Sequence, residues 1–221
     1  MLLKSKRFSV LSAVALGIFS LVGMALGGAQ VPQTKGKDMD LSEANRKVNE
    51  RPLSFIENAG QWNSKAKFLL RSSEIYYWVT SKGFVLDYKA AKPTDKLSGH
   101  AVAVEFAGGN QAQVAGEFRK DVIRDFINKD GSATRANGFN EVRSKGIYKG
   151  IDLRSYVDGR AARYDIEVAP NTDPSVIALK FTGAKSLSIT PKGDLAIGTA
   201  LGTKEMVGLK AYQVVNGQQK T

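Results

Sequence analysis

Apolar and polar residues alternate over short stretches through most of the chain, which is the pattern of half-buried β-strands. Clusters rich in Gly, Pro, Asn and Asp, such as NTDPS and TPKGD, separate these stretches and indicate turns. We expect strands at residues 68–70, 74–80, 84–90, 100–106, 175–181, 186–190, 194–197 and 209–215. The pattern therefore predicts an all-β fold over residues 53–221, an antiparallel domain like a β-sandwich.

The N-terminal part of the chain has a different pattern. Lys4, Lys6 and Arg7 precede an uncharged apolar run at 10–26, and small residues follow at 27–29, as signal peptidase requires. We therefore expect residues 1–29 to be a signal peptide that is cleaved near Ala29. Because the apolar run is long, a retained membrane anchor is the alternative.

Residues 30–52 are polar and contain Gly and Pro, which predicts a flexible leader. Within it, Leu41, Ala44 and Val48 have helical spacing, so we expect one short helix there. The predicted organisation is thus a signal peptide, a leader with a short helix, and one all-β domain.

The basic composition changes the choice of partner. The chain has 32 Lys and Arg against 21 Asp and Glu, and loss of residues 1–29 would leave 29 against 21, a net charge of +8. The basic residues are scattered and the protein is expected to be exported, so we do not expect nucleic-acid binding. A cell-surface polysaccharide or an envelope protein suits this charge better, with membrane contact only if the N-terminal segment is retained. The absence of cysteine excludes disulfides and a lipid-modified N-terminus.

Catalytic and metal chemistry is restricted by residue types. His100 is the only histidine, and no G-x-S-x-G motif accompanies it, so nucleophilic catalysis of the Ser–His–Asp kind is not expected. Zinc sites need more His or Cys ligands than the chain has. Residues 128–132 carry oxygen ligands but lack the downstream Glu of a calcium loop, so a plain turn is the better interpretation. We expect no metal and no cofactor.

A hairpin is predicted at residues 150–170, where Asp158-Gly159 is a strong two-residue turn signal. The register that follows from this turn places Asp152 opposite Asp165 and Arg154 opposite Arg163. Opposite charges then meet on the diagonals, so the polar face should carry a cluster of four charges.

This polar face supports two hypotheses. Arg154, Tyr156 and Arg163 are candidate binding residues for a polar ligand. Asp152 and Asp165 are the candidates for a carbohydrate-active hydrolase, because glycosidases use paired carboxylates. Neighbouring arginines favour ionised carboxylates, whereas a general acid must hold a proton, so we take the hydrolase as the alternative.

The stretch EIYYWVT places aromatic residues on both faces of one strand. Ile75, Tyr77 and Val79 share a face that suits the core, and Tyr76 and Trp78 lie on the other face. Neighbouring aromatic rings on an exposed sheet can stack against sugars, so these two are candidate binding residues. Burial beneath a second layer explains the same pattern.

The stretch FIENAGQW predicts a strand that ends at Asn58 and turns through Gly60, with Trp62 folding back onto the sheet. A binding site formed by Glu57, Asn58 and Gln61 is the alternative. The stretch opens a recurring set of residues. The set consists of Phe55, Glu57, Asn58, Gly60 and Gln61, followed by Gly150, Ile151, Asp152, Tyr156, Tyr164, Asp165, Val168, Pro170, Asp173, Pro174, Ile177, Phe181, Gly183 and Ala184.

With this set the chain resembles, over residues 53–215, an uncharacterised family of exported bacterial domains. Those domains stand at the N-terminus of cell-surface proteins with SBBP-type β-propeller repeats. The resemblance implies an all-β surface module with no assigned activity. Such proteins continue further, and this sequence stops at QVVNGQQKT, so it is either a short relative or a truncated one.

These observations together predict an exported, non-enzymatic structural or interaction module that binds glycan or an envelope partner. The hydrolase that would use Asp152 and Asp165 is the alternative.

Overall fold

The structure is a computed structural model that describes residues 5–10, 53–94, 97–127, 131–215 and 218–220. These residues form β-strands and one short 3₁₀ turn, with no α-helix among them. The predicted all-β antiparallel class is therefore confirmed. The apolar run of the signal peptide, the flexible leader and the short helix lie outside the described residues. Within the part that is described, no helix is long and apolar enough to span a membrane.

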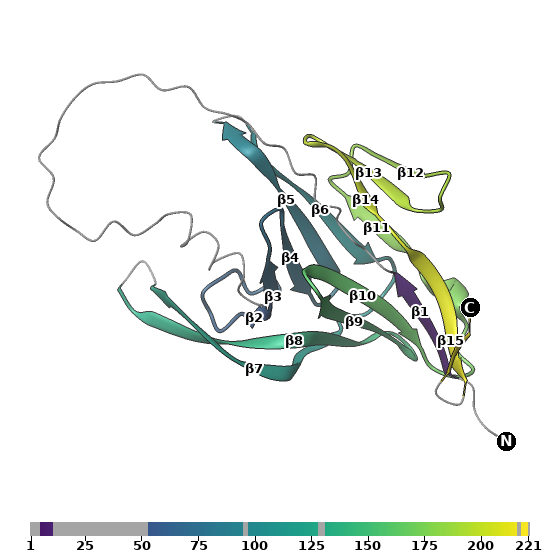
Figure 1. Cartoon of the computed structure of the whole chain (residues 1–221). Coiled ribbons are helices and arrows are strands. Elements are labelled where there is room, and N and C mark those ends of the chain that lie inside the picture. Colours follow the sequence, from purple (N-terminus) through teal and green to yellow (C-terminus); the bar gives the residue numbers. More distant parts are fainter. Residues whose placement is uncertain (1–4, 11–52, 95–96, 128–130, 216–217, 221) are drawn as a thin grey trace, which may run out of the picture. The chain divides into compact units, whose positions relative to one another are not determined.

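Figure 1 shows the strands labelled in the order of the chain. They are β1 (Ser5–Val10), β2 (Phe55–Glu57), β3 (Ala66–Arg71), β4 (Ile75–Thr80), β5 (Gly83–Thr94), β6 (Leu97–Phe106), β7 (Gln113–Ile127), β8 (Ala133–Tyr148), β9 (Ile151–Asp158), β10 (Ala161–Val168), β11 (Leu179–Thr182), β12 (Ser186–Ile189), β13 (Leu195–Thr199), β14 (Gly202–Met206), β15 (Leu209–Val215) and β16 (Gln218–Lys220), with the 3₁₀ turn η1 at Pro174–Val176.

Thirteen strands form one curled sheet in the order β11-β6-β5-β4-β3-β2-β8-β9-β10-β1-β15-β16, with β7 paired to β8, and β12-β13-β14 form a second, small sheet. Two parts of the large sheet meet at β8. One edge of β8 pairs with β7, and the other passes from β2 at residues 138–139 to β9 further along. The predicted sandwich is not confirmed: most core residues lie on this one continuous sheet, and Ile197 and Met206 of the small sheet join the same core.

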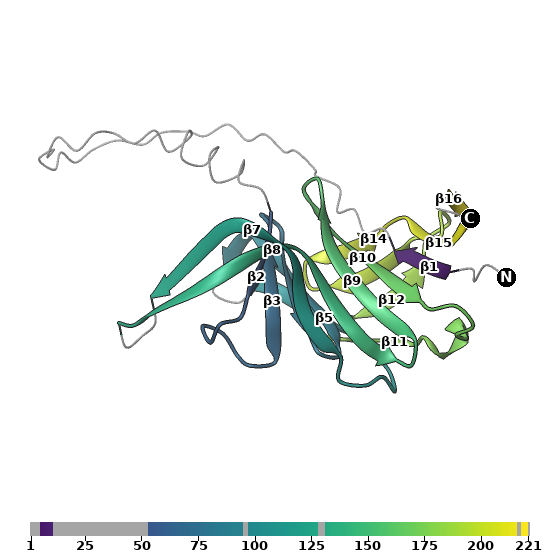
Figure 2. The ribbon, with the colours of Figure 1, turned by 90° about the horizontal axis from the view of Figure 1, so that it is seen from below.

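The core lies between the two arms that meet at β8, one from β2 to β6 and the other formed by β9 and β10 (Figure 2). The rings of Phe84 and Tyr164, one from each arm, have centroids 4.9 Å apart. A hydrogen bond of 3.1 Å joins the Tyr77 hydroxyl to Ser155 Oγ, again across the arms. Burial raises the pKa of both Tyr77 and Tyr164. The aromatic side chains therefore hold the curl of the sheet closed.

The structure departs from the predicted strands at 175–181 and over β7 and β8. The expected strand at 175–181 begins as the turn η1 instead, because Asp173 caps it by accepting from the Ser175 N–H at 2.9 Å, and Pro174 lacks a donor. The long strands β7 and β8 were not predicted. Both carry many polar residues and glycines, which resemble loop signals.

The β9–β10 hairpin differs from its predicted register. Its two-residue loop is Gly159-Arg160, not Asp158-Gly159, so each pairing moves by two residues. Arg154 stands opposite Asp165 and Tyr156 opposite Arg163. The inward and outward faces stay as predicted, because a shift of two keeps the alternation. Like-charged arginines no longer face each other.

Candidate functional site

Asn58 organises the FIENAGQW turn, which follows directly after β2. Its side-chain nitrogen donates toward the carbonyls of Trp62 (3.2 Å), Asn63 (2.9 Å) and Ala66 (2.8 Å), so three acceptors share two N–H groups. Its Oδ1 accepts from the backbone N–H groups of Gly60 (3.1 Å) and Trp62 (3.2 Å). Gly60 has φ of 112°, a conformation that favours glycine.

Glu57 and Gln61 are engaged in the same way. Glu57 Oε1 accepts from the backbone N–H of Asn137 at 2.8 Å and from the Asn137 side chain, which ties β2 to β8. Gln61 donates to the Glu57 carbonyl and accepts from the Ala59 N–H, both at 2.7 Å. The three polar side chains of this stretch, Glu57, Asn58 and Gln61, therefore bond to the turn itself or to β8, which is what a structural turn requires.

Trp62 folds back from this turn onto the outward face of the sheet. Its ring centroid is 5.4 Å from that of Trp78 and 5.3 Å from that of Phe126, both edge-on. Beneath these rings lie Ile56 and Leu69, which are 8% and 0% exposed and register with each other across β2 and β3. We call these five residues the outer cluster. They form a second apolar layer on the side of the sheet opposite the core.

Next to the outer cluster, the outward face becomes a strip of small side chains. Trp78 registers with Val85, which registers with Ala103, and Ala103 with Thr182 on β11. Trp78 is half-buried, its ring contacts Trp62 of the outer cluster, and it stands opposite Val85, the first residue of this strip.

Tyr76 lies beside this strip, half-buried on the same face of β4. The Arg71 guanidinium is 5.3 Å from its ring centroid and the Lys89 ammonium 4.5 Å. Both distances are within the range of cation–π attraction. Trp78, Tyr76, the strip and the two basic residues make up what we call the aromatic face. It combines rings, small side chains and two basic residues, and Asp87 on β5 stands opposite Tyr76 on the same face.

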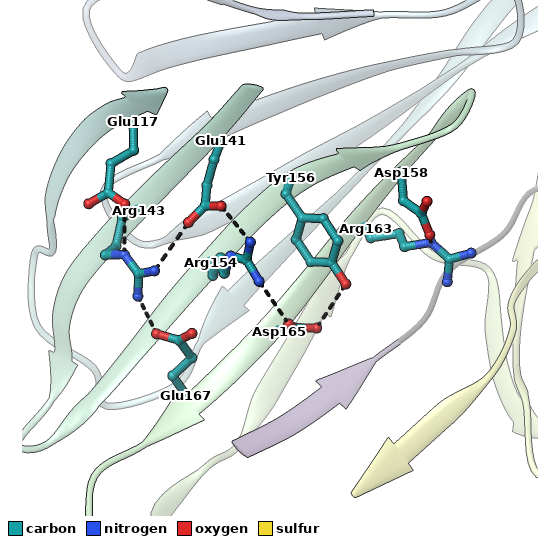
Figure 3. Close-up of polar contacts among 9 residues, drawn as sticks. All are labelled: Glu117, Glu141, Arg143, Arg154, Tyr156, Asp158, Arg163, Asp165 and Glu167. Atoms are coloured by element: carbon teal, nitrogen blue, oxygen red, sulfur yellow. Dashed lines mark hydrogen bonds and ion pairs between the residues drawn. The ribbon is translucent and has the colours of Figure 1, made fainter. Parts of the chain in front are cut away.

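A second polar region occupies the outward face of β7 to β10, where charged side chains pair with one another (Figure 3). We call it the charged network. Its members are Glu117 on β7, Glu141 and Arg143 on β8, Arg154 on β9, and Asp165 and Glu167 on β10.

Glu141 is the centre of the charged network, with only 3% of its side chain exposed. Its carboxylate lies 3.1 Å from Nη2 of Arg143 and 2.6 Å from Nη2 of Arg154. The hydrogen bond that Arg154 donates to Glu141 raises the pKa of Arg154, against the lowering effect of burial. A buried carboxylate between two guanidinium groups is a stabilising arrangement only while all its partners are present.

The two arginines connect Glu141 to the remaining acids. Burial lowers the pKa of Arg143, but its contacts with Glu167 and Glu117 outweigh this and raise it. Arg154 Nη1 is 3.7 Å from Asp165, whose side chain is 3% exposed, and the Arg154 guanidinium lies 4.5 Å from the Tyr156 ring. The charged side chains of the network are therefore paired with one another.

The predicted site residues of the hairpin occupy the edge of this network. Arg163 Nε lies 2.7 Å from the Asp158 carboxylate as an ion pair, but it has no well-directed hydrogen bond to any described residue. The Tyr156 hydroxyl donates to Asp165 at 3.4 Å. Asp152 accepts from the Gly146 N–H at 2.8 Å. The structure therefore brings Arg154, Tyr156 and Asp165 together.

The two candidate catalytic aspartates are not paired across the hairpin. Asp152 stands opposite Glu167, whereas Asp165 stands opposite Arg154. The single histidine, His100, bonds through Nε2 to the Gly183 carbonyl at 2.8 Å. Within the described ranges, no three acidic or histidine side chains converge as a metal site requires.

The binding residues predicted from the sequence lie in two separate regions of the sheet, the aromatic face and the hairpin beside the charged network. Tyr76 and Trp78 lie on β4, with β3, β2 and β8 between them and β9, so the predicted binding residues form two separate groups. Glu141 and Arg143 were missed because β8 was not predicted. Their alternation with Val142, which is fully buried, is the signal that could have found them.

The comparisons with known proteins identify the family. The chain belongs to the family described as a domain of unknown function, DUF7948, whose model matches residues 55–221. The matched range begins at Phe55, the first residue of the FIENAGQW turn, and includes all the residues on which the resemblance rests. No curated protein and no solved structure matches the chain.

Proposed function

We propose that this DUF7948 domain is an exported, non-enzymatic interaction module that binds an acidic polysaccharide of the cell envelope through its aromatic face. The observation that carries this proposal is the outward position of Trp78 and Tyr76 beside a strip of small side chains on β5 and β6. Export, a cleaved signal peptide and attachment to SBBP-type repeats belong to the same proposal, supported by the sequence of residues 1–29 and by the resemblance.

The strip gives a sugar room to approach Trp78. The residues that stand beyond Trp78 in the register, Val85 and Ala103, have short side chains and therefore take up little room on this face of β5 and β6. The C–H faces of pyranose rings pack against aromatic rings of this kind, and the ring edge and neighbouring polar groups then fix orientation. A polysaccharide lying along the strip would cover both.

The charge beside the rings favours acidic sugars. Arg71 and Lys89 flank Tyr76, within 5.3 Å and 4.5 Å of its ring centroid. A uronate carboxylate could exchange these contacts for stronger charge-assisted hydrogen bonds without moving the sheet. The net charge of +8 that the chain would carry without residues 1–29 adds an attraction that weakens with salt.

A hydrolase is not part of this proposal. Asp165 has 3% of its side chain exposed and is held by Arg154, so it is closed to a substrate. Asp152 lies opposite Glu167 rather than opposite Asp165. No observation therefore favours a pair of cooperating carboxylates at these positions.

The test is affinity electrophoresis or titration of the purified exported protein against polygalacturonate and alginate, with neutral dextran as the comparison. We expect binding to the uronate polymers and a loss of at least about tenfold in Trp78→Ala. Because Trp78 also contacts Trp62, a second variant, Ala101→Glu, keeps the outer cluster and places a negative, larger side chain at an exposed position of the same face. Equal affinity of both variants and the wild type would contradict the proposal.

A further inference from the structure

Strand β1 occupies a central position in the large sheet, between β10 and β15 (Figure 1). Its residues register antiparallel with β10 from Lys6 opposite Val168 to Val10 opposite Tyr164. On its other edge it registers with β15 from Ser5 opposite Val214 to Val10 opposite Leu209. β10 and β15 do not pair with each other anywhere in the described sheet. The connection between them is β1 alone.

The same six residues belong to the predicted signal peptide. Ser5–Val10 contains two of its three basic residues and the start of its apolar run. Cleavage near Ala29 would remove the whole strand from the exported protein. Neighbouring strands are about 4.8 Å apart, so losing the strand between them leaves a gap of about 10 Å between β10 and β15. Backbone groups on both edges of that gap would lose their partners.

From this conflict we infer that, in the exported protein, the space between β10 and β15 is a docking slot for an extended segment of another polypeptide. The inference rests on the proposed export with cleavage of residues 1–29. It does not depend on the aromatic face or on the identity of the polysaccharide. The partner adds one strand to an existing sheet, and its main chain supplies most of the contacts.

The register defines which segment fits. The three β1 positions at 6, 8 and 10 lie opposite Val168, Ile166 and Tyr164, whose side chains are 2–4% exposed and belong to the core. Apolar residues at the last two of these positions continue the core face.

The alternate positions of β1 face the opposite side of the sheet. Arg7 lies opposite Glu167 and Ser9 opposite Asp165. Both acids belong to the charged network, in which four carboxylates surround two guanidinium groups. A basic residue at the position of Arg7 therefore complements β10, and an acidic residue there opposes it. The fitting partner is an extended segment that alternates apolar and polar residues and is basic between them.

The leader of the exported chain is a poor substitute for β1. Residues 30–52 contain only Met39 and Leu41 in apolar alternation, and these stand next to Asp38 and Asp40. In the slot, such a segment would set its acids against Asp165 and Glu167. A strand from another chain is thus the better occupant.

The experiment measures binding of the synthetic peptide KSKRFSVL, which is residues 4–11, to the protein exported by its own cells. N-terminal sequencing first establishes where that protein begins. We expect it to begin near residue 30, to bind the peptide, and to gain about 5–10 °C in thermal midpoint at 100-fold excess over Kd. The full chain, whose slot β1 already fills, should not bind.

Two altered peptides serve as controls. In one, Ser9→Pro removes a backbone donor and breaks the strand while keeping the apolar and basic residues. In the other, Arg7→Glu places a carboxylate opposite Glu167. We expect no binding of the first and at least about tenfold weaker binding of the second. The full chain carrying Ser9→Pro should gain binding of the unaltered peptide, which provides a test that does not need the exported form.

The outcomes separate the two proposals. An exported protein that still begins before Ser5 would contradict both the cleavage and the slot. A protein that begins near residue 30 but binds none of the peptides, or binds all three equally, would contradict the slot alone. Loss of polysaccharide binding in Trp78→Ala with unchanged peptide binding would support the aromatic face as a separate site.

Discussion

The aromatic face and the charged network lie on outward surfaces of the same curled sheet, but their side chains differ in how exposed they are to solvent. On the aromatic face, Trp78 and Tyr76 are half-buried, and their rings border a strip with small side chains. In the charged network, Glu141 and Asp165 have 3% of their side chains exposed, and each contacts an arginine.

This difference separates stability from binding. A buried charge requires a partner, so the polar groups of the network are committed to one another and leave little for a ligand. Aromatic rings need no such partner and keep a usable face. We therefore expect substitutions in the network to change stability and substitutions on the aromatic face to change binding.

The largest effect is expected from Glu141→Gln. The change removes the negative charge that Arg143 and Arg154 share. Arg143 keeps Glu167 and Glu117, whereas Arg154 keeps only the more distant Asp165. We expect the free energy of unfolding to fall by about 3 kcal/mol, as for a broken buried ion pair. Urea unfolding followed by tryptophan fluorescence measures this change.

The matched control is Asp125→Asn. Arg135 and Asp125 form an ion pair at 2.9 Å whose side chains are 71% and 52% exposed. Its loss should leave the unfolding midpoint unchanged within error. An equal loss of stability in the two variants would contradict the account of the network as a buried structure.

A smaller effect is expected from Trp62→Ala. The ring joins the FIENAGQW turn to Trp78 and Phe126 but is half-buried, so we expect a loss of about 2 kcal/mol, less than the ~3–5 kcal/mol of a fully buried tryptophan. The exposed Ile127, at 76%, provides the comparison as Ile127→Ala, which should be close to neutral. If Trp62→Ala is as mild as Ile127→Ala, the outer cluster does not stabilise the sheet.

The core between the arms predicts a loss of stability at alkaline pH. Burial raises the pKa of Tyr88 from 10.0 to about 12. The folded state therefore holds this proton more tightly than the unfolded state, and the stability it gives is complete below pH 10 and lost as the pH rises toward about 12. In Tyr88→Phe the unfolding free energy should fall less steeply over that range.

Urea unfolding at several pH values, with pH 8 as the reference for each protein, measures this slope. Identical slopes for Tyr88→Phe and wild type would contradict the assignment of the alkaline loss to this residue. Tyr77 and Tyr164, whose pKa values burial also raises, should keep a residual slope in the variant.

The sequence predicted the features that depend on local alternation. The opposite faces of Tyr76 and Tyr77 follow from period two, and the hairpin between β4 and β5 follows from the Ser81-Lys82-Gly83 turn. The predicted β9–β10 register was wrong because the two-residue loop was placed at Asp158-Gly159, one residue before its position in the structure. In the observed register Arg154 stands opposite Asp165, a pairing of opposite charges.

Features that depend on distant packing were not predictable. Glycine generally weakens a strand, yet Gly116 and Gly138 lie within β7 and β8. A Cβ on Gly116 would come 2.5 Å from the Phe139 ring, and one on Gly138 3.1 Å from Val122, so these glycines allow close approach. Glu141 pairs with Arg143 and Arg154, which lie on two different strands. No local sequence pattern predicts that these side chains come into contact.

The most direct test of the central claim compares two candidate binding residues that the structure assigns to different roles. Affinity of the exported protein for polygalacturonate is measured for wild type, Trp78→Ala and Arg163→Gln, at a temperature where all three are folded. The account predicts that Trp78→Ala loses at least about tenfold in affinity while Arg163→Gln binds like the wild type. Binding that is lost in Arg163→Gln and kept in Trp78→Ala would contradict it.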